Sequence, residues 1–249
     1  MNKTLETIDN LRSIHGNFAD REIVESNMDL IINASLKAAT GGCLQSYSII
    51  DIDDKELMEK ICGYRGSRTL VFLADVNRHN SCGEYLGKKF PAPGFSYFMM
   101  AVSDAILAAQ NAVVAARSLG IDSLVNTGIH RADQEELFRL LNLPEKNCFP
   151  LISVVFGYTD EEPSFTKGRL NGPAIVHKNR YALPNEQLIK KIIHEYDDPQ
   201  KHLSLSDTWK EKYNHYLEYV YSEWFTEAVD DEEEQLQKYF QRSGFVGKE

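Results

Sequence analysis

The most continuous apolar pattern in this chain runs from Asp104 to Gly120, where alanines recur at the three- and four-residue spacing of a helix. Apolar residues occupy nearly the whole circumference of this helix, which is typical of a helix buried on most sides. Small side chains on several faces indicate that other backbones approach closely. We expect a central helix that begins at Ser103 or Asp104 and ends at Gly120. The alanines are Ala105, Ala108, Ala109, Ala112, Ala115 and Ala116.

This helix has the composition of a core element rather than of a membrane span. A spanning helix needs about 20 nearly uncharged residues, whereas charged and amide side chains interrupt this segment. The interrupting residues are Asp104, Gln110, Asn111 and Arg117.

Shorter patterns on both sides of the helix predict an α+β fold. Continuous or alternating apolar residues predict strands, and three- or four-residue spacing predicts helices. The prolines and glycines of residues 77–97 indicate a long irregular excursion before the central helix. The predicted strands are 47–52, 69–74, 124–128 and 151–158, and the predicted helices are 4–11, 26–39, 53–61 and 133–141.

The C-terminal quarter differs in composition from the rest. From Pro184 onward the chain has a helical pattern that becomes increasingly polar, with an aromatic stripe that includes Trp209 and Trp224. There is neither an internal repeat nor a Ser/Gly linker. We therefore predict one structural domain, in which residues 1–183 form the core and residues 184–249 form a helical extension.

Charge and cysteine content narrow the class of protein. With 27 basic and 37 acidic residues the net charge is −10, and the absence of a basic block argues against a nucleic-acid partner. The first residues contain no apolar segment, so we expect no signal peptide. The four cysteines form no CxxC pair, which favours a reducing cytoplasm. His79 and Cys82 lie close in the sequence and could supply half of a metal site, but a chance occurrence is the simpler interpretation. We therefore expect no metal.

Four polar junctions between regular elements are the candidates for chemistry: Arg12–His15, Thr40–Gln45, Asn126–Gly128 and Lys167–Arg169. Guanidinium and ammonium groups suit a phosphate, and glycines let backbone N–H groups approach a flat ring closely. Each junction also has an ordinary interpretation as a helix end, a helix C-cap or a solvated turn. The sequence contains no GxGxxG, P-loop or Ser/His/Asp signature that would indicate another chemistry.

Taken in order, these junctions resemble the nitroreductase superfamily of FMN-dependent oxidoreductases, and most closely its NADPH-flavin reductase and oxygen-insensitive nitroreductase branch. The resemblance extends over essentially the whole chain. The matching stretches are Arg12-Ser13-Ile14, Thr40–Gln45 followed by Ser48-Ile49-Ile50, Asn77-Arg78-His79, Ala109–Ala112, Ser118-Leu119-Gly120, Leu143-Pro144, Lys167 with Arg169, and His177–Tyr181.

The resemblance implies an α+β sandwich around a mostly antiparallel sheet, assembled as an intertwined homodimer. The central helix and the C-terminal extension would lie between subunits, which would account for the alanines. FMN would bind at the dimer interface, and a reduced nicotinamide, NADPH or NADH, would supply the electrons. The acceptor would be a flavin, a nitroaromatic compound or a quinone. The alternative is a flavin-binding or regulatory protein of the same fold with little turnover.

The resemblance also assigns cofactor-binding residues, and it requires no catalytic acid or base because the cofactor performs the chemistry. The phosphate and ribityl end would be held by Arg12, Ser13, Lys167 and Arg169. The flavin ring would lie between the loop of Thr40, Gly41, Gly42, Cys43 and Leu44 and the turn of Asn126, Thr127 and Gly128, with His15 at its pyrimidine edge.

The chain departs from the family pattern around the ring. His15 stands where the family has arginine, so the charge there becomes dependent on pH. The loop after Ile61 is shorter and lacks the ring-contacting glutamine, for which Arg65 or Arg68 could substitute. The arginines that would hold an adenosine 2′-phosphate are also missing, which leaves Lys201 and His202.

Overall fold

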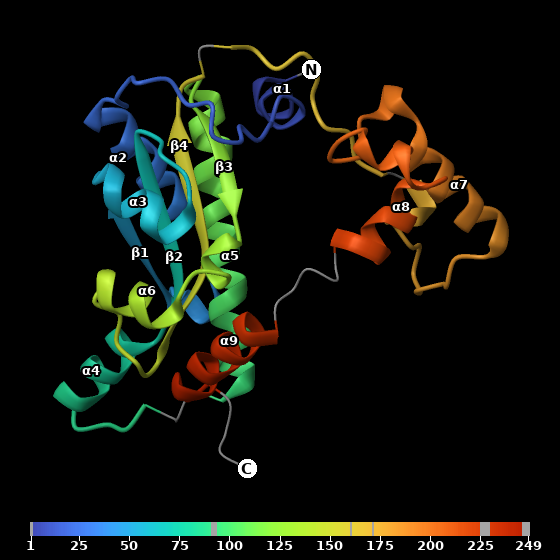
Figure 1. Ribbon diagram of the computed structural model, residues 1–249. Helices are drawn as coiled ribbons and strands as arrows, with labels where there is room; N and C mark the ends of the chain where they lie inside the picture. Colours follow the sequence, from blue (N-terminus) through green and yellow to red (C-terminus); the bar gives the residue numbers. More distant parts are fainter. Residues whose placement is uncertain (1, 91–93, 160, 171, 225–229, 246–249) are drawn as a thin grey trace. The chain divides into compact units, whose positions relative to one another are not determined.

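The computed structural model describes residues 2–90, 94–159, 161–170, 172–224 and 230–245. The chain divides into two compact units (Figure 1). Unit 1 consists of residues 1–161 together with 230–249, and unit 2 consists of residues 162–229. The predicted division into 1–183 and 184–249 stays a prediction, since it separates a cofactor-binding core from an extension rather than two compact bodies.

Unit 1 is built on an antiparallel sheet of strand order β1-β2-β4-β3, which confirms the predicted fold class. The two central strands are apolar without alternation because helices cover both of their faces, and β4 is buried throughout. The strands are β1 (Tyr47–Ile52), β2 (Arg68–Asp75), β3 (Asp122–Asn126) and β4 (Cys148–Gly157).

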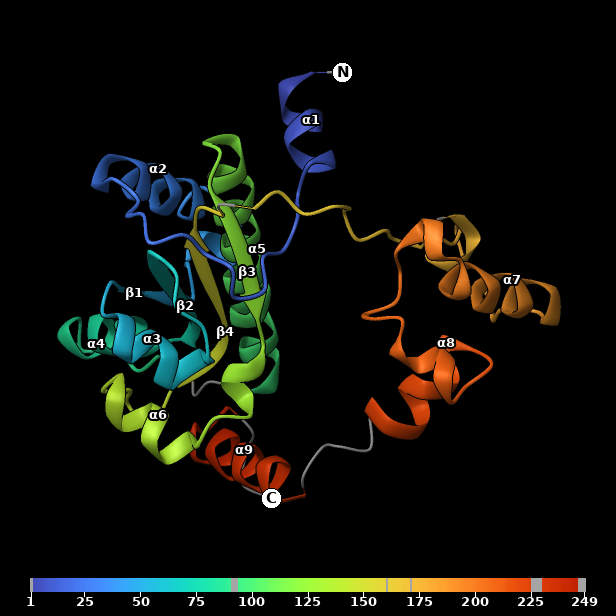
Figure 2. The same ribbon diagram turned by 45° about the horizontal axis from the view of Figure 1, so that its top comes forward.

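Helices pack on both faces of this sheet (Figures 1 and 2). One core cluster lies between the sheet and helices α2 and α5, and a second lies between the sheet and helices α3 and α6. Residues 77–85 form helix α4, so the predicted irregular excursion is partly wrong. The bounds are α1 (Lys3–Asp9), α2 (Glu25–Ser35), α3 (Lys55–Cys62), α4 (Asn77–Tyr85), α5 (Phe95–Ser118), α6 (Gln134–Leu140) and α9 (Asp230–Arg242).

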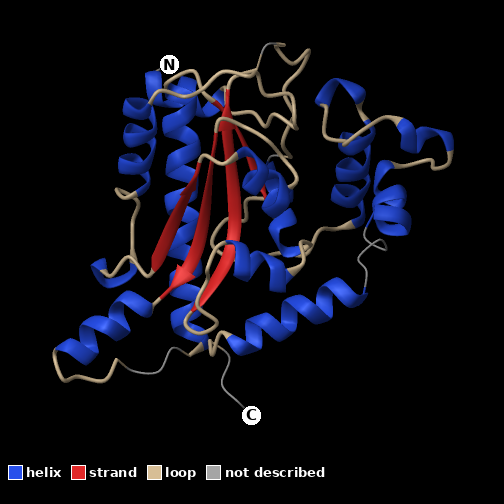
Figure 3. Cartoon of the chain, turned by 60° about the vertical axis from the view of Figure 1, so that its left-hand side comes forward, coloured by secondary structure: helices blue, strands red, loops and turns tan. Residues whose placement is uncertain are grey.

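Helix α5 runs the length of the sheet (Figure 3). It begins at Phe95, nine residues before the predicted start, because the apolar run before Ser103 continues the helix. Asp104 therefore lies inside the helix and does not cap it. By length and composition α5 could also cross a membrane. In the fold its small side chains pack in the core of unit 1, which is the environment of a core helix.

The alanines of α5 are buried within a single chain. Ala101, Ala105, Ala108, Ala112 and Ala116 have no exposed surface, and they pack against the sheet and α2. The expectation that a dimer interface explains them is therefore wrong. Alanine is needed because α5 lies close to two neighbouring layers at once.

The last helix of the chain, α9, belongs to unit 1. Phe240 of α9 lies 4.7 Å from Phe98 and 5.2 Å from Phe149, measured between ring centroids. Phe245 just beyond the helix is fully buried. The C-terminal segment thus completes the apolar core at one end of the sheet.

Unit 2 contains α7 (Glu186–Asp197) and the short helix α8 (Tyr216–Tyr219). Its small core consists of Trp209, Tyr216 and Val220, with Tyr213 partly buried beside them. These residues come from the predicted aromatic stripe. The side chain of Asp197 joins the two helices, because its carboxylate accepts hydrogen bonds from the backbone N–H of Tyr216 at 2.9 Å and from Nδ1 of His215 at 2.7 Å.

The bond to Asp197 raises the pKa of His215 above its ordinary value. The protonated histidine therefore stabilises unit 2 fully below about pH 6.5. This contribution is lost as the pH rises through the raised pKa. We expect Asp197→Asn to return the pKa of His215 toward its ordinary value, as measured by NMR titration of the imidazole. An unchanged pKa in this variant would contradict the assignment.

Candidate functional site

The first predicted junction forms an isolated β-bridge to the edge strand β3. Ser13 forms a parallel bridge with Ser123 of β3, and the N–H of Ile14 donates to the carbonyl oxygen of Ser123 at 3.1 Å. Because side chains alternate along an extended segment, Ile14 is buried whereas Ser13 and His15 are exposed. The structure thus presents the hydroxyl and the imidazole on one outer face.

Arg12 has a partner inside the protein. Its guanidinium donates to both carboxylate oxygens of Asp122, at 2.7 and 2.9 Å, and Arg117 of α5 donates to the same carboxylate at 3.0 Å. Asp122 is 4% exposed and Arg12 is 12% exposed. This placement differs from the predicted phosphate contact, since the guanidinium is bound in a buried ion pair that fixes the position of Ser13.

A second aromatic side chain lies beside His15. The ring centroids of His15 and Tyr64 are 6.5 Å apart in an edge-to-face arrangement. Tyr64 follows Gly63, which ends α3 with φ of 74° and turns the chain toward His15. Sequence reasoning missed Tyr64, although the glycine that ends the helix was a signal that the next residues turn back onto the fold.

The predicted turn after β3 belongs to the same region. The side-chain amide of Asn126 donates to the carbonyl oxygen of Cys62 at 2.8 Å and accepts from the N–H of Gly128 at 2.7 Å. Thr127 is exposed at the tip of the turn. A Cβ at position 128 would lie 2.8 Å from the Asn126 oxygen, so glycine is required for this closure. The structure therefore links His15, Tyr64 and Asn126–Gly128 through the end of α3, as one group.

Neither proposed substitute for the missing glutamine is available in this group. Arg65 pairs with Glu59 on α3. Arg68 pairs with Asp51 at 2.8 Å and with Glu25 at 3.3 Å, and it is 15% exposed. Both guanidinium groups are bound by neighbouring carboxylates, and Tyr64 is the side chain that the shortened loop places beside His15.

The loop that precedes β1 is held on α5. Thr40 Oγ1 donates to Asp104 at 2.6 Å, and the N–H of Gly41 donates to the same carboxylate at 2.8 Å. A Cβ at Gly41 would lie 2.5 Å from the side chain of Met100, so the loop approaches α5 more closely than other residues allow. Gly42, Cys43 and Leu44 are exposed at the outer side of this turn.

These two groups lie at opposite edges of one sheet. The Thr40–Leu44 loop leads into β1, whereas Ser13 is bridged to β3. Three strand spacings of about 4.8 Å separate these edges, or about 14 Å. Among the described residues, no hydrogen bond or ring contact is found between the loop and His15 or Tyr64.

Lys167 and Arg169 lie in unit 2 on either side of Gly168. Lys167 Nζ donates to the carbonyl oxygens of Ser204 and Leu205, and Arg169 donates to that of Gly168 at 2.8 Å. Both side chains are exposed, and Lys167 also lies 5.2 Å from the ring centroid of Phe165. Among the described residues no carboxylate is found beside either cation, so both suit an anion.

Comparison with known proteins identifies the family to which this fold belongs. A family model described as the nitroreductase family matches residues 86–158. The NADPH-dependent FMN reductase of Bacillus subtilis is 30% identical over 233 residues, which cover 90% of each chain. This chain belongs to the nitroreductase family. The oxygen-insensitive NADPH nitroreductase of Salmonella typhimurium is also 30% identical, over 85% of this chain and 89% of its own.

The structural similarity of this nitroreductase extends over its full length. Nitroreductase A from Vibrio parahaemolyticus superposes with a TM-score of 0.80 at 25% identity, and the alignment covers 100% of both chains. The matched family segment, residues 86–158, contains α5, β3 and β4, which position Asp104, Asp122 and the Asn126–Gly128 turn.

Two features of unit 2 bear on the nucleotide that this nitroreductase accepts. Lys201 lies 3.5 Å from the carboxylate of Glu195, and the ring of His202 stacks on Phe165 with centroids 4.1 Å apart. Both of the remaining candidates for a 2′-phosphate therefore have partners within unit 2.

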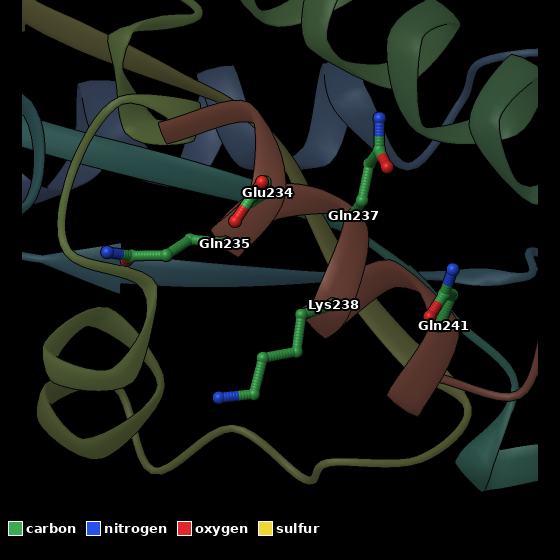
Figure 4. A pocket seen from close by; sticks show the side chains of 5 residues that line it. All are labelled: Glu234, Gln235, Gln237, Lys238 and Gln241. Carbon is green, nitrogen blue, oxygen red and sulfur yellow. The ribbon is translucent and has the colours of Figure 1, made fainter. Parts of the chain in front are cut away.

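Two open depressions in the described part of the chain contain none of the predicted residues. A depression of about 540 Å³ on α9 is lined by polar side chains of both charges and by no aromatic ring (Figure 4). Another of about 370 Å³ lies between α7 and α8 and is mainly apolar, with Ile189 and Tyr221 in its wall. Neither has the cations and glycine-lined turns that a phosphorylated ring compound needs.

Proposed function

We propose that this nitroreductase is an FMN-dependent NAD(P)H oxidoreductase that reduces flavins, nitroaromatic compounds or quinones in a ping-pong cycle. The observation that carries the proposal is its 30% identity, over 90% of both chains, to an enzyme named FMN reductase. A protein named Cr(VI) reductase from a Pseudomonas strain, 33% identical over 196 residues, is a relative as well. The acceptor is therefore a small molecule whose identity the family leaves open.

Each unit, taken by itself, carries residues with chemistry that suits FMN. Lys167 and Arg169 suit the phosphate because both are exposed cations whose partners are neutral carbonyl groups. Ser13 offers a hydroxyl on the face that it shares with His15. The Asn126–Gly128 turn and the Thr40–Leu44 loop would enclose the ring. When bound, FMN supplies the hydride transfer.

The imidazole of His15 would lie at the pyrimidine edge of the ring. In its protonated form it places a positive charge where reduction makes the ring more negative. Tyr64 restricts the imidazole on one side. Thr127 and Gly128 would bring backbone groups to the same edge, and no catalytic acid or base is required from this chain.

The separation of the two ring-side groups supports a homodimer with FMN at its interface. The Thr40–Leu44 loop of one copy would face the His15, Tyr64 and Asn126–Gly128 group of the other. Helix α5 offers a surface for this contact, because the side opposite its alanines carries exposed apolar residues. These are Met99, Ile106 and Leu107, at 48%, 40% and 47% exposure.

We expect Leu107→Glu to weaken dimerisation at least about tenfold, because it places a carboxylate in the proposed apolar interface. The protomer should fold normally, since Leu107 is half exposed in the single chain. Sedimentation equilibrium measures the effect, with Leu86→Glu at a 67% exposed position as the matched control. The proposed interface would be refuted if the unsubstituted protein were monomeric, or if Leu107→Glu had the same dimer dissociation constant as the unsubstituted protein.

The electron donor is NADPH or NADH. The names of the two bacterial relatives include NADPH. In this chain the two candidates for contact with its 2′-phosphate have other partners, since Lys201 is paired with Glu195 and His202 is stacked on Phe165. A weak grip on the 2′-phosphate would allow both nucleotides. The free thiols among the described residues, Cys43, Cys62, Cys82 and Cys148, support a location in the reducing cytoplasm.

An anaerobic titration tests the function. The purified protein should be yellow and should release FMN on denaturation. Stoichiometric NADPH or NADH should bleach the flavin absorption, and a quinone or nitroaromatic compound should restore it. A yellow protein that neither nucleotide bleaches would favour the alternative, a flavin-binding or regulatory protein. A protein that binds no FMN would overturn the proposal.

A further inference from the structure

A buried carboxylate on α5 has no role in the function described so far. Asp104 is 2% exposed and lies in the middle of a helix that is otherwise lined by alanine and other apolar residues. Burial of a charged group is costly unless hydrogen bonds or an opposite charge compensate it. Among the described residues, no ion pair is found for Asp104.

The compensation comes from one loop. Asp104 Oδ2 accepts from Thr40 Oγ1 at 2.6 Å and from the N–H of Ser46 at 3.2 Å, and Oδ1 accepts from the N–H of Gly41 at 2.8 Å. The hydroxyl of Thr40 in turn accepts from the N–H of Gln45 at 2.8 Å. The carboxylate thereby ties the first and the last residue of the Thr40–Ser46 loop to the same point on α5.

The loop needs such an anchor because its backbone is unfavourable. Gly42, Cys43 and Gln45 have φ of 58°, 59° and 52°. Two of these are not glycine, and left-handed conformations at such residues persist only where surrounding contacts hold them. Relaxation of the loop would move Gly42, Cys43 and Leu44, which are its exposed residues.

The backbone hydrogen bonds within the loop do not use all of its N–H groups. Those of Gly41 and Ser46 bind Asp104, and those of Leu44 and Gln45 bind Gly41 O and Thr40 Oγ1. The N–H of Gly42 is among those for which no hydrogen-bond partner is found in the described part of the chain. Because Gly42 is exposed, the anchored conformation leaves a backbone donor on a residue without Cβ at the outer side of the turn.

We propose that Asp104 is the positioning residue of the flavin site, and that its buried carboxylate holds the Thr40–Ser46 loop in the shape that binds the FMN ring. This inference rests on the proposed function. It separates the anchoring of the loop from the binding itself: Asp104 touches the loop from behind, and Gly42–Leu44 meet the ring in front.

Asp104→Asn tests the inference with little change in volume. An asparagine has one acceptor oxygen and one NH2 group, so at least one of the three donors loses its acceptor and faces another donor. We expect the affinity of the apoprotein for FMN, measured by quenching of FMN fluorescence, to fall about tenfold or more. We expect amide hydrogen exchange of Gly41 and Ser46 in the apoprotein to accelerate by a similar factor.

Thr40→Val is the second variant, because it removes the hydroxyl that links Asp104 to Gln45 and keeps the shape of the side chain. Met58→Ala is the matched control for lost stability alone, since Met58 is fully buried on α3 in the other core cluster and touches no part of the loop. We expect Met58→Ala to lower the unfolding midpoint while the FMN affinity and the visible circular dichroism of bound FMN stay unchanged. Asp104→Asn and Thr40→Val should alter both.

The outcomes distinguish this inference from the proposed function. The positioning role would be overturned, and the proposed function left intact, by either of two results. One is that Asp104→Asn and Thr40→Val bind FMN as tightly as the unsubstituted protein, and the other is that Met58→Ala loses as much FMN affinity as they do. Slow amide exchange at Gly41 and Ser46 in Asp104→Asn would do the same, independently of FMN. Failure of the unsubstituted protein to bind FMN would overturn the proposed function, and the inference with it.

Discussion

Replacing Asp122 by asparagine should lower the free energy of unfolding by about 3 kcal/mol, at the lower end of what removal of one partner from a buried ion pair costs. Asp122 is 4% exposed and is shared by Arg12 and Arg117, which are 12% and 23% exposed. Without the carboxylate, Arg117 keeps its charge in a poorly solvated place, and Arg12 loses the two hydrogen bonds that Asp122 accepts. Urea denaturation monitored by circular dichroism measures the loss.

The origin of this loss can be tested with a compensating variant. If the cost comes from the positive charge that Asp122 no longer neutralises, the triple substitution Arg12→Met, Asp122→Leu and Arg117→Met should recover much of the stability, because it removes the charges together. A triple variant less stable than Asp122→Asn would show that the ion pair itself stabilises the fold. A single variant with unchanged stability would contradict the structural role of Asp122.

Arg169→Ala should weaken the binding of FMN by about ten- to a hundredfold, because a charge-assisted hydrogen bond to a phosphate contributes about 1.5–3 kcal/mol. The variant should purify largely without colour. Arg169 is exposed in unit 2, and it donates hydrogen bonds to carbonyl oxygens of its own loop, so the variant should lose little stability. Equilibrium dialysis against FMN measures the effect.

Lys190→Ala is the control, since it removes an exposed cation of the same unit whose carboxylate partner, Glu186, lies on its own helix. Its affinity for FMN should not change. Arg12→Ala should instead lose stability more than affinity, because Arg12 is bound to Asp122. Unchanged binding of FMN in Arg169→Ala would refute the phosphate assignment.

The sequence was sufficient for the elements whose patterns are local. The sheet, the central helix and the family followed from apolar spacing and from short motifs, because these depend on neighbouring residues. The alanines indicated close packing correctly, but their spacing could not show against what they pack. That surface, the sheet and α2, is formed by residues far away along the chain.

The partners of individual polar side chains could not be predicted from the sequence. Arg12 and Asp122 are 110 residues apart, and Thr40 and Asp104 are 64 apart, so no local pattern connects them. Arg12 was predicted to contact a phosphate, and Asp104 was a candidate for the start of a helix, because each prediction used only the residues adjacent in the sequence. Tyr64 was missed because its position depends on how α3 ends relative to the β3 edge.

The place of α9 in the core has a consequence for the order of synthesis. Phe240 and Phe245 pack against residues of α5, but they are synthesised only after residues 162–229. Part of the apolar surface of the sheet and α5 therefore stays uncovered while the intervening segment is translated. During that interval we expect the nascent chain to be open to chaperones and proteases at this end of the sheet.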